Sequence, residues 1–332
     1  MKKYLFIGVI ALVVAGFTAL TNYPVDPAQI RSAITKSLPL LQQSSHNFLL
    51  NAGGCHSCHG QSLGAVTFYM AKEKGFAVQD TILKEALDSI QSTWIRRSKY
   101  LAQHEDPTAI VVTGSYDLWA FAENKTPGNK VREMLAVNIM HRQLKDGSWV
   151  SPNLRPPMEY YSITATALAL KGIQVYIPGV HTAEVKQRVA RASVWLKGMI
   201  PVTNEEKVFQ ILGLQWAGEN ISFINEQVNK LVHAQRRDGG WAQLDSLPSD
   251  AYATGQSIYA LLKSGKNKSS PEIQKGLDYL LRTQADDGSW HVRTRSFPSV
   301  PFTESGFPHG PDQFISAAGS HWATMALIEA LE

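Results

Sequence analysis

Apolar residues recur at three- and four-residue spacing through most of the chain, as in Ile273, Leu277, Leu280 and Leu281. This spacing is typical of amphipathic helices. The more charged helices are expected at 28–50, 79–97, 129–143, 182–198, 221–235 and 271–284. Helices richer in Ala, Thr, Gly and Leu are expected at 62–74, 109–122, 162–176, 206–217, 252–264 and 315–331. Small residues permit close helix packing, so the second set is predicted to form an inner ring inside the first.

A short motif follows three of the outer helices, at Gln143–Trp149, Gln235–Trp241 and Gln284–Trp290. The interval between the first and second copies is close to twice that between the second and third, which predicts a degenerate copy of the motif near Trp195. Its Asp-Gly pair suits a turn, because glycine accepts positive φ at little cost. Its tryptophan is expected to bury its ring and bond through the indole N–H. Repetition at a fixed period predicts about six helical hairpins, which form one all-α domain, an α/α toroid, over residues 28–332.

The pattern Gln-x-x-Asp-Gly-Gly/Ser-Trp resembles the repeat of the squalene-hopene cyclase and protein prenyltransferase superfamily. The resemblance implies a toroid that binds or transforms an apolar, isoprenoid-type ligand in the ring centre. The Asp-x-Asp-Asp acid motif of the protonating cyclases is absent from the sequence. Asp250 resembles the zinc-binding aspartate of the prenyltransferases and His321 lies near their histidine, but Tyr252 replaces their cysteine. These residues alone would make a poor zinc site.

The N-terminus carries a targeting pattern. Lys2 and Lys3 precede an uncharged apolar run from Tyr4 to Leu20. This arrangement is typical of an export signal. Residues 1–21 are therefore predicted to be a signal peptide or an N-terminal membrane anchor. The body is expected to be exported, either periplasmic or held at the membrane by this segment.

The sequence has 2 cysteines, which cannot build a disulfide framework. They form Cys55-His-Ser-Cys58-His59, the attachment signature of c-type haem. In that chemistry two thiols bind the macrocycle and the adjacent histidine ligates the iron. The main hypothesis is therefore an exported protein with one covalent haem c on Cys55, Cys58 and His59, acting with a redox partner in electron transfer or redox chemistry. Candidates for a sixth iron ligand are Met70, His104, Met140 and His141.

Other chemistries remain open for the same segment. Cys55 and Cys58 suit a disulfide, and His46, His56 or His59 suit a zinc site. Cys58-His-Gly-Gln61 is similar to the Cys-Gly-Glu-Gln motif of thioester domains, which are also α/α toroids. That resemblance implies a thioester between Cys58 and Gln61.

A long loop from His291 to Phe314 interrupts the last repeat. Long loops inside compact domains are usually functional or disordered. The catalytic candidates near it are Asp250, Tyr252, His309 and Asp312, with Arg293, Arg295 and Glu304 as further charged groups. Alternatively these charges pin the loop, and Ser249 or Asp250 caps a helix. This loop and the segment 249–255 resemble exported bacterial repeat proteins that combine the haem motif with a toroid.

The overall charge of the chain indicates whether nucleic acid is an expected partner. The formal net charge is +4 with 32 Lys+Arg against 28 Asp+Glu, and no basic run stands out. Nucleic-acid binding is therefore not expected.

Overall fold

A computed structural model describes residues 24–105, 110–151, 155–297 and 302–331. The predicted signal or anchor at 1–21 lies outside the described residues. Within them, no helix is long and apolar enough to cross a bilayer. They contain two isolated β-bridges, Arg155–Glu159 and Trp241–Asp250, and no longer strand.

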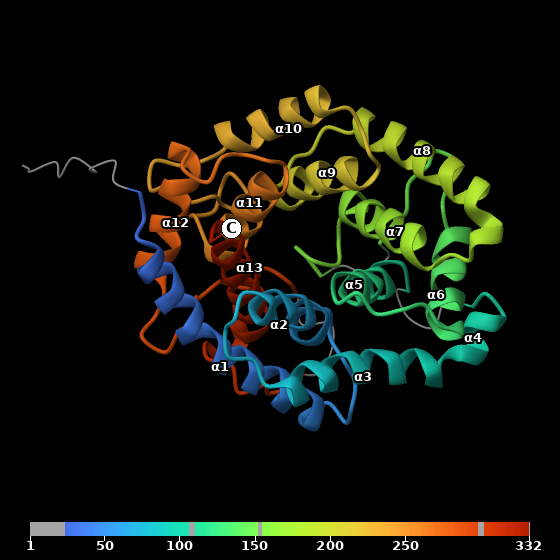
Figure 1. The fold of residues 1–332 in the computed structure, drawn as a ribbon, viewed down its shortest axis with the longest axis horizontal. Helices are drawn as coiled ribbons and strands as arrows, with labels where there is room; N and C mark the ends of the chain where they lie inside the picture. The colour runs from blue at the N-terminus through green and yellow to red at the C-terminus, as the bar shows by residue number, and fades with distance from the viewer. Residues whose placement is uncertain (1–23, 106–109, 152–154, 298–301, 332) are drawn as a thin grey trace, which may run out of the picture.

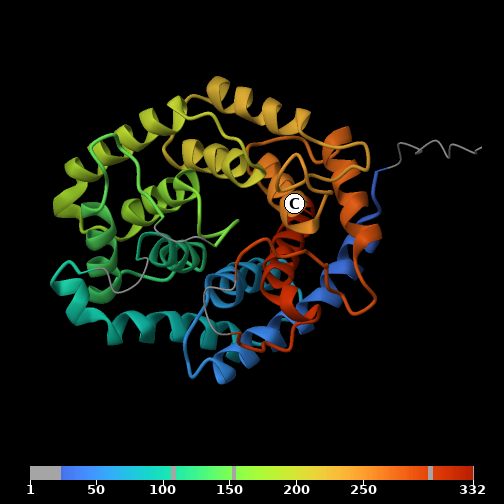
Figure 2. The ribbon, with the colours of Figure 1, turned by 180° about the vertical axis from the view of Figure 1, so that it is seen from behind.

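The helices form two concentric rings (Figures 1 and 2). The outer ring is α1 (Pro27–Asn51), α3 (Asp80–Arg96), α6 (Lys130–His141), α8 (Thr182–Gly198), α10 (Ile221–His233) and α12 (Pro271–Thr283). The inner ring is α2 (Leu63–Glu73), α5 (Ile110–Glu123), α7 (Ser162–Tyr176), α9 (Asn204–Trp216), α11 (Ala251–Lys263) and α13 (Gln313–Ala330). A short helix, α4 (Ser98–Ala102), follows α3. The predicted all-α toroid of six hairpins is confirmed.

The glutamine of each of the three repeat turns donates a hydrogen bond to the next outer helix around the ring. In the last turn, Gln284 Nε2 donates to Gly288 O at 3.0 Å and to Ala33 O of α1 at 2.9 Å. That second bond connects the final hairpin to the first and closes the ring. Trp290 Nε1 donates to Leu280 O at 2.8 Å, as predicted for a buried indole.

We expect Gly288→Ala to lower the free energy of unfolding by about 3 kcal/mol. Gly288 has φ 90°, and an added Cβ would lie 2.3 Å from Lys36 O of α1. Gly265→Ala is the matched control, because Gly265 has φ 85° but open space around the same position. Urea denaturation should show that the control substitution lowers the free energy of unfolding by about 1 kcal/mol. Equal effects of the two substitutions would contradict the ring-closing role of the turn.

Three hairpins depart from the repeat. The sequence between α3 and α5 has no copy of the motif and forms α4 there. The turn from α8 to α9 contains none of the motif, and Trp195, predicted to mark a degenerate copy, lies within α8 instead. The turn from α1 to α2 carries the two cysteines and a π-helical turn, η1 (Cys58–Ser62), that runs directly into α2.

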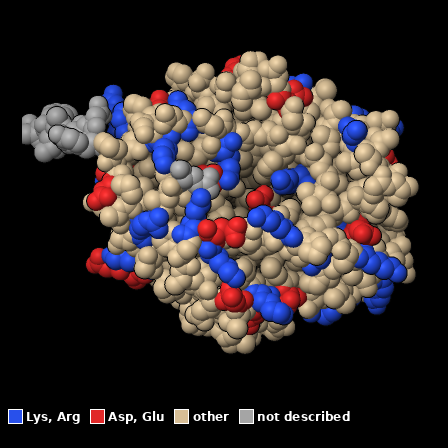
Figure 3. Space-filling view, in the orientation of Figure 1, with Lys and Arg blue, Asp and Glu red and all other residues tan. Residues whose placement is uncertain are grey.

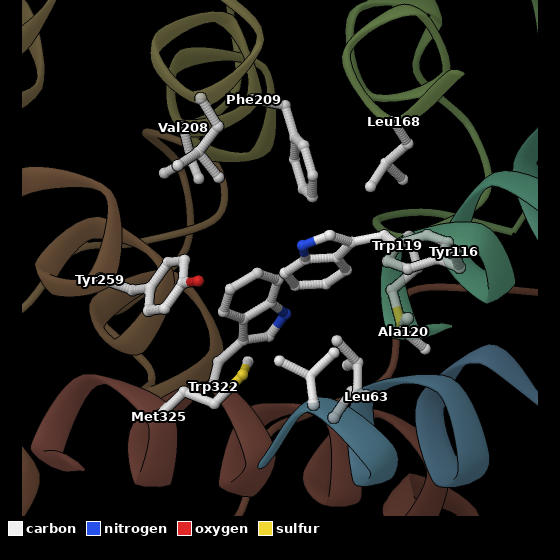
Figure 4. Packing of buried hydrophobic residues seen from close by; sticks show 14 of the residues in the cluster. Leu63, Tyr116, Trp119, Ala120, Leu168, Val208, Phe209, Tyr259, Trp322 and Met325 are labelled. Atoms are coloured by element: carbon white, nitrogen blue, oxygen red, sulfur yellow. The ribbon is translucent and has the colours of Figure 1, made fainter. Parts of the chain in front are cut away.

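Aromatic side chains from several inner helices fill the ring centre (Figure 4). Trp119 of α5 stacks on Trp322 of α13 at 5.8 Å between ring centroids. Phe209 and Tyr259 meet Trp322 edge-on at 6.2 and 5.6 Å. Basic and acidic side chains are interspersed over the surface in Figure 3, which is hollowed near the ring centre. The interior is therefore strongly apolar and aromatic, whereas the face shown mixes basic and acidic side chains.

Candidate functional site at the mouth of the ring

The loops that run from outer to inner helices meet at one end of the toroid, called the mouth here. They lead into the N-termini of the inner helices. The loop between α6 and α7 reaches inward over the ring centre (Figures 1 and 2). A hollow of about 420 Å³ opens beside the start of α7. Its lining residues are Ser151, Tyr160, Tyr161, Ser162, Ile163, Met199 and Glu206.

Glu205, in the first turn of α9, is the most unusual group at the mouth. Its side chain is buried and accepts hydrogen bonds from Tyr252 Oη at 2.9 Å and Gln256 Nε2 at 2.8 Å, both on Oε2. Thr164 Oγ1 donates to the other oxygen, Oε1, at a longer 3.3 Å. Burial raises the pKa of Glu205 to about 7, against the opposing effect of these donors. This carboxyl is therefore protonated in a substantial fraction of molecules near neutral pH.

Tyr116 of α5 connects Glu205 with the aromatic centre. Its ring is fully buried and lies 6.4 Å from Phe209 and 6.3 Å from Trp119. Phe209 stands one helical turn after Glu205 on the same face of α9. Burial, and then the charge of Glu205, raise the pKa of Tyr116 well above its usual value. The acid therefore sits one turn above the aromatic cluster.

The cysteine segment reaches the same mouth. Cys58 is buried, and its Sγ donates to Glu159 Oε1 at 3.4 Å. Glu159, on the inward loop, also pairs with Arg155. Burial raises the pKa of Cys58 well above its usual value, and Glu159 and Asp117 add to the effect. The thiol is thus held neutral, which does not favour a nucleophilic role. Cys55, in contrast, is exposed.

His59 packs among aromatic rings. Its ring centroid lies 4.8 Å from that of Phe314 and 5.4 Å from that of Phe48. Burial lowers its pKa to about 4, so the ring is neutral at neutral pH. Its Nε2 is buried and bonds to no group that the structure describes. A neutral imidazole with an unpaired Nε2 is what an iron ligand requires.

His56, between the two cysteines, anchors the segment to the ring. Its Nε2 lies 2.9 Å from Asp117 Oδ2 and its Nδ1 lies 3.0 Å from Thr93 Oγ1. Asp117 also accepts from Trp94 Nε1 at 2.7 Å and Ser62 Oγ at 2.6 Å. With both nitrogens engaged, His56 is in no position to act as a base for Cys58.

The catalytic candidates from the sequence take three different roles. Tyr252 belongs to the mouth through its bond to Glu205. Asp250 caps α11, accepting from Ala253 N at 2.8 Å, as the alternative interpretation predicted. Burial raises the pKa of Asp250 to about 6. His309 and Asp312 bond instead within the last repeat, so they pin the loop rather than face Glu205.

Two side-chain hydrogen bonds hold His309 and Asp312 within the last repeat. His309 Nε2 lies 2.9 Å from Ser289 Oγ, and Asp312 Oδ2 lies 2.8 Å from His291 Nε2. Arg293 and Glu304 are exposed. Arg295 alone of the loop's charged residues reaches the mouth, donating to Gln243 Oε1 at 2.8 Å and Tyr161 Oη at 3.0 Å.

The alternatives for the cysteine segment fare differently. Gln61 Nε2 donates to Ser45 O at 2.9 Å, so the amide is tied away from the thiol of Cys58. His46 pairs with Glu85 at 2.8 Å. Among the described residues no group of three or more His, Cys, Asp and Glu side chains is arranged to hold a metal ion. His321 bonds to Thr67 at 3.0 Å, not to Asp250.

The candidate sixth ligands also have ordinary places. Met140 is buried in the core, Met70 is partly buried against it, and His104 stacks on His141 at 5.1 Å. The two histidines lie where α4 and α6 meet.

Sequence reasoning missed Glu205. Its neighbour Glu206 completes a capping box with Thr203, which explains only the second of the two adjacent glutamates. The spacing of Glu205 to Phe209 places Glu205 on the apolar inner face of α9. An acidic residue on the apolar face of an inner helix was the sequence feature that could have identified this site.

Comparison with known proteins agrees with this architecture. No protein-family model matches the chain. Over 131 residues it is 28% identical to dammaradiene synthase of Dryopteris crassirhizoma, a stretch that covers 35% of this chain and 17% of that enzyme. The type II terpene cyclase MstE from Scytonema covers 92% of this chain and 98% of its own with a TM-score of 0.56 at 13% identity. The chain has the α/α-toroid fold of the terpene cyclases.

Other solved structures superpose similarly. A protein from Actinoplanes covers 92% of this chain with a TM-score of 0.62 at 11% identity, and all of its own chain. A possible member of the GH105 family from Salmonella enterica covers 98% of this chain and 99% of its own with a TM-score of 0.53 at 12% identity. At these identities the likeness establishes the fold and leaves the chemistry to the site itself.

Proposed function

We propose that this toroid binds an apolar, isoprenoid-type ligand at its mouth, above the aromatic ring centre, and acts on it by acid catalysis, with Glu205 as the proton donor. The observation that carries the proposal is the buried Glu205 carboxyl, whose pKa of about 7 suits general acid work near neutral pH. A strongly perturbed carboxyl at a ring mouth is a candidate functional group on physical grounds.

The geometry assigns the proton to one oxygen. Oε2 of Glu205 already accepts two short bonds, from Tyr252 and Gln256. Oε1 has a single long contact with Thr164, at 3.3 Å. The proton therefore belongs on Oε1. A cation formed below it would be near the aromatic cluster that contains Trp119 and Trp322, and aromatic rings attract positive charge.

The comparisons support an isoprenoid-type ligand. One structure of the cyclase MstE, at 12% identity and a TM-score of 0.54, is described with geranylgeranyl dihydroxybenzoate as substrate. Since the Asp-x-Asp-Asp motif is absent from this sequence, an acid in this chain must come from elsewhere. Glu205 supplies one.

Farnesene tests this proposal as a plain hydrocarbon probe. Titration should quench the tryptophan fluorescence of the protein saturably. In D₂O, recovered farnesene should gain deuterium, because protonation of an alkene and loss of a different proton exchange hydrogen with solvent. Glu205→Gln should slow this exchange by about 10²–10⁴-fold. Glu226→Gln, which changes an exposed glutamate of the outer helix α10, is the control and should exchange normally. Absence of saturable binding, or equal exchange in both variants, would refute the proposal.

A second function, covalent haem c attachment for electron transfer or redox chemistry, is favoured by the buried and unpaired Nε2 of His59. Cys55 and Cys58 would hold the macrocycle and His59 would ligate its iron, which would supply one-electron chemistry. The donor set fits: His59 is neutral, and Cys55 is exposed to an incoming group. A hollow of about 650 Å³ borders Gly53 and Gly54 beside the segment. Export by residues 1–21 and a redox partner belong to this second proposal.

Haem attachment has a direct spectroscopic test. Protein from cells competent in cytochrome c maturation should show a c-type α-band in a pyridine haemochrome spectrum. Cys58→Ser should remove attachment through two thioethers, and His59→Ala should change the axial-ligand spectrum. Wild-type protein with both thiols free and no α-band would exclude this second function while leaving the proposal for Glu205 intact.

A further inference from the structure

Two buried polar atoms beside Glu205 have no partner, although buried polar groups are nearly always hydrogen-bonded. The hydroxyl of Tyr116 and the Oε1 of Gln256 are buried and bond to nothing in the part of the chain that the structure describes. Both residues are fully buried. One is a potential donor and the other can only accept.

Both atoms belong to the immediate surroundings of the acid. Gln256 donates through Nε2 to Glu205 Oε2 at 2.8 Å, which leaves its Oε1 turned away from that bond. Tyr116 packs on Phe209, which lies one helical turn below Glu205. Its phenol also interacts electrostatically with Glu205 and Tyr252. The unpaired donor and the unpaired acceptor therefore belong to two buried side chains that both neighbour the acid.

A hydroxyl group is the ligand chemistry that satisfies both atoms. Its oxygen accepts from Tyr116 Oη and its hydrogen is donated to Gln256 Oε1. We propose that Tyr116 and Gln256 form a hydroxyl-binding site beneath Glu205, so that the substrate class is an isoprenoid-type alcohol rather than a plain hydrocarbon. This inference rests on the proposed function and narrows it.

The placement defines a balanced reaction. Glu205 Oε1 transfers its proton to the bound hydroxyl oxygen, and the carbon–oxygen bond breaks with its electron pair leaving on water. The aromatic cluster that contains Trp119 and Trp322 stabilises the resulting carbocation. Loss of a proton from the neighbouring carbon to the Glu205 carboxylate gives an alkene and restores the acid. The alcohol is thus converted to an alkene plus water, with no oxidant or reductant.

Farnesol and farnesene form the matched pair of probes, because they differ by one molecule of water. Wild-type protein is expected to bind farnesol at least tenfold more tightly than farnesene, and to convert farnesol to a product lighter by one water. Tyr116→Phe should bring the two affinities to within about threefold, since it removes one of the two hydroxyl contacts. Tyr176→Phe is the control, because the Tyr176 hydroxyl bonds to Thr126 O at 2.9 Å and serves no ligand here.

The free protein supplies a second readout. Tyr116→Phe should leave thermal stability unchanged or raised without ligand, because it deletes an unsatisfied hydroxyl, whereas Tyr176→Phe should lower it. Loss of stability in Tyr116→Phe would show that the hydroxyl already has a partner and would overturn the inference. Equal binding of farnesol and farnesene would also overturn it while leaving the proposed function standing. Failure of both probes to bind would refute the proposed function itself.

Discussion

Asp117→Ala is expected to lower the free energy of unfolding by about 3–5 kcal/mol, because it removes a buried acceptor of three hydrogen bonds. Asp117 is fully buried and accepts hydrogen bonds from His56, Trp94 and Ser62. The substitution leaves these three donors unsatisfied inside the ring. Urea denaturation followed by circular dichroism measures the change.

Glu85→Ala is the control for Asp117. Glu85 pairs with His46 at 2.8 Å, but both side chains are about one-third exposed. Its loss should cost about 0–1 kcal/mol, because solvent screens such a pair. A similarly small effect for Asp117→Ala would mean that the cysteine segment is not anchored through His56.

Glu205→Gln is expected to stabilise the protein by about 3 kcal/mol at pH 8 and by close to nothing at pH 4. Burial raises the pKa of Glu205 from 4.5 to about 7 in the folded chain. Between these values the unfolded state releases the proton more readily, so wild-type stability falls as pH rises. Glutamine cannot ionise and keeps the hydrogen-bonding shape, so the variant avoids that loss.

The comparison requires denaturation curves of wild type and variant at both pH values. Glu206→Gln is the control at the adjacent position, since glutamine can still complete the capping box with Thr203. Its effect should be small and similar at both pH values. A stabilisation by Glu205→Gln that does not change between pH 4 and pH 8 would contradict a raised pKa.

Much of the fold could be predicted from local patterns. Residues within the motif determine the conformation of the turns at Gln143, Gln235 and Gln284, because the positive-φ glycine and the buried indole act within a few residues. The helix ranges therefore agree with the structure to within about three residues. The prediction of a degenerate repeat near Trp195 was wrong, because a tryptophan without the neighbouring turn residues does not specify a turn.

The site was harder to predict because its members come from distant hairpins. Cys58 and Tyr252 were identified individually, but the residues that define their surroundings, Glu159 and Glu205, lie in other repeats. His309 and Asp312 sit on a loop rich in functional residue types, yet they bond to Ser289 and His291 nearby. Only packing around the ring determines which charged groups lose water, and that is what shifts the pKa of Glu205.

The central claim is that Glu205 is a buried acid which keeps its proton near neutral pH. Infrared difference spectroscopy of wild type against Glu205→Gln measures this directly, because a protonated carboxyl has a C=O band distinct from that of a carboxylate. The band assigned to Glu205 should persist at pH 6 and disappear as the pH passes through about 7. A band that is already lost near pH 4.5, as for a solvated glutamate, would contradict the account.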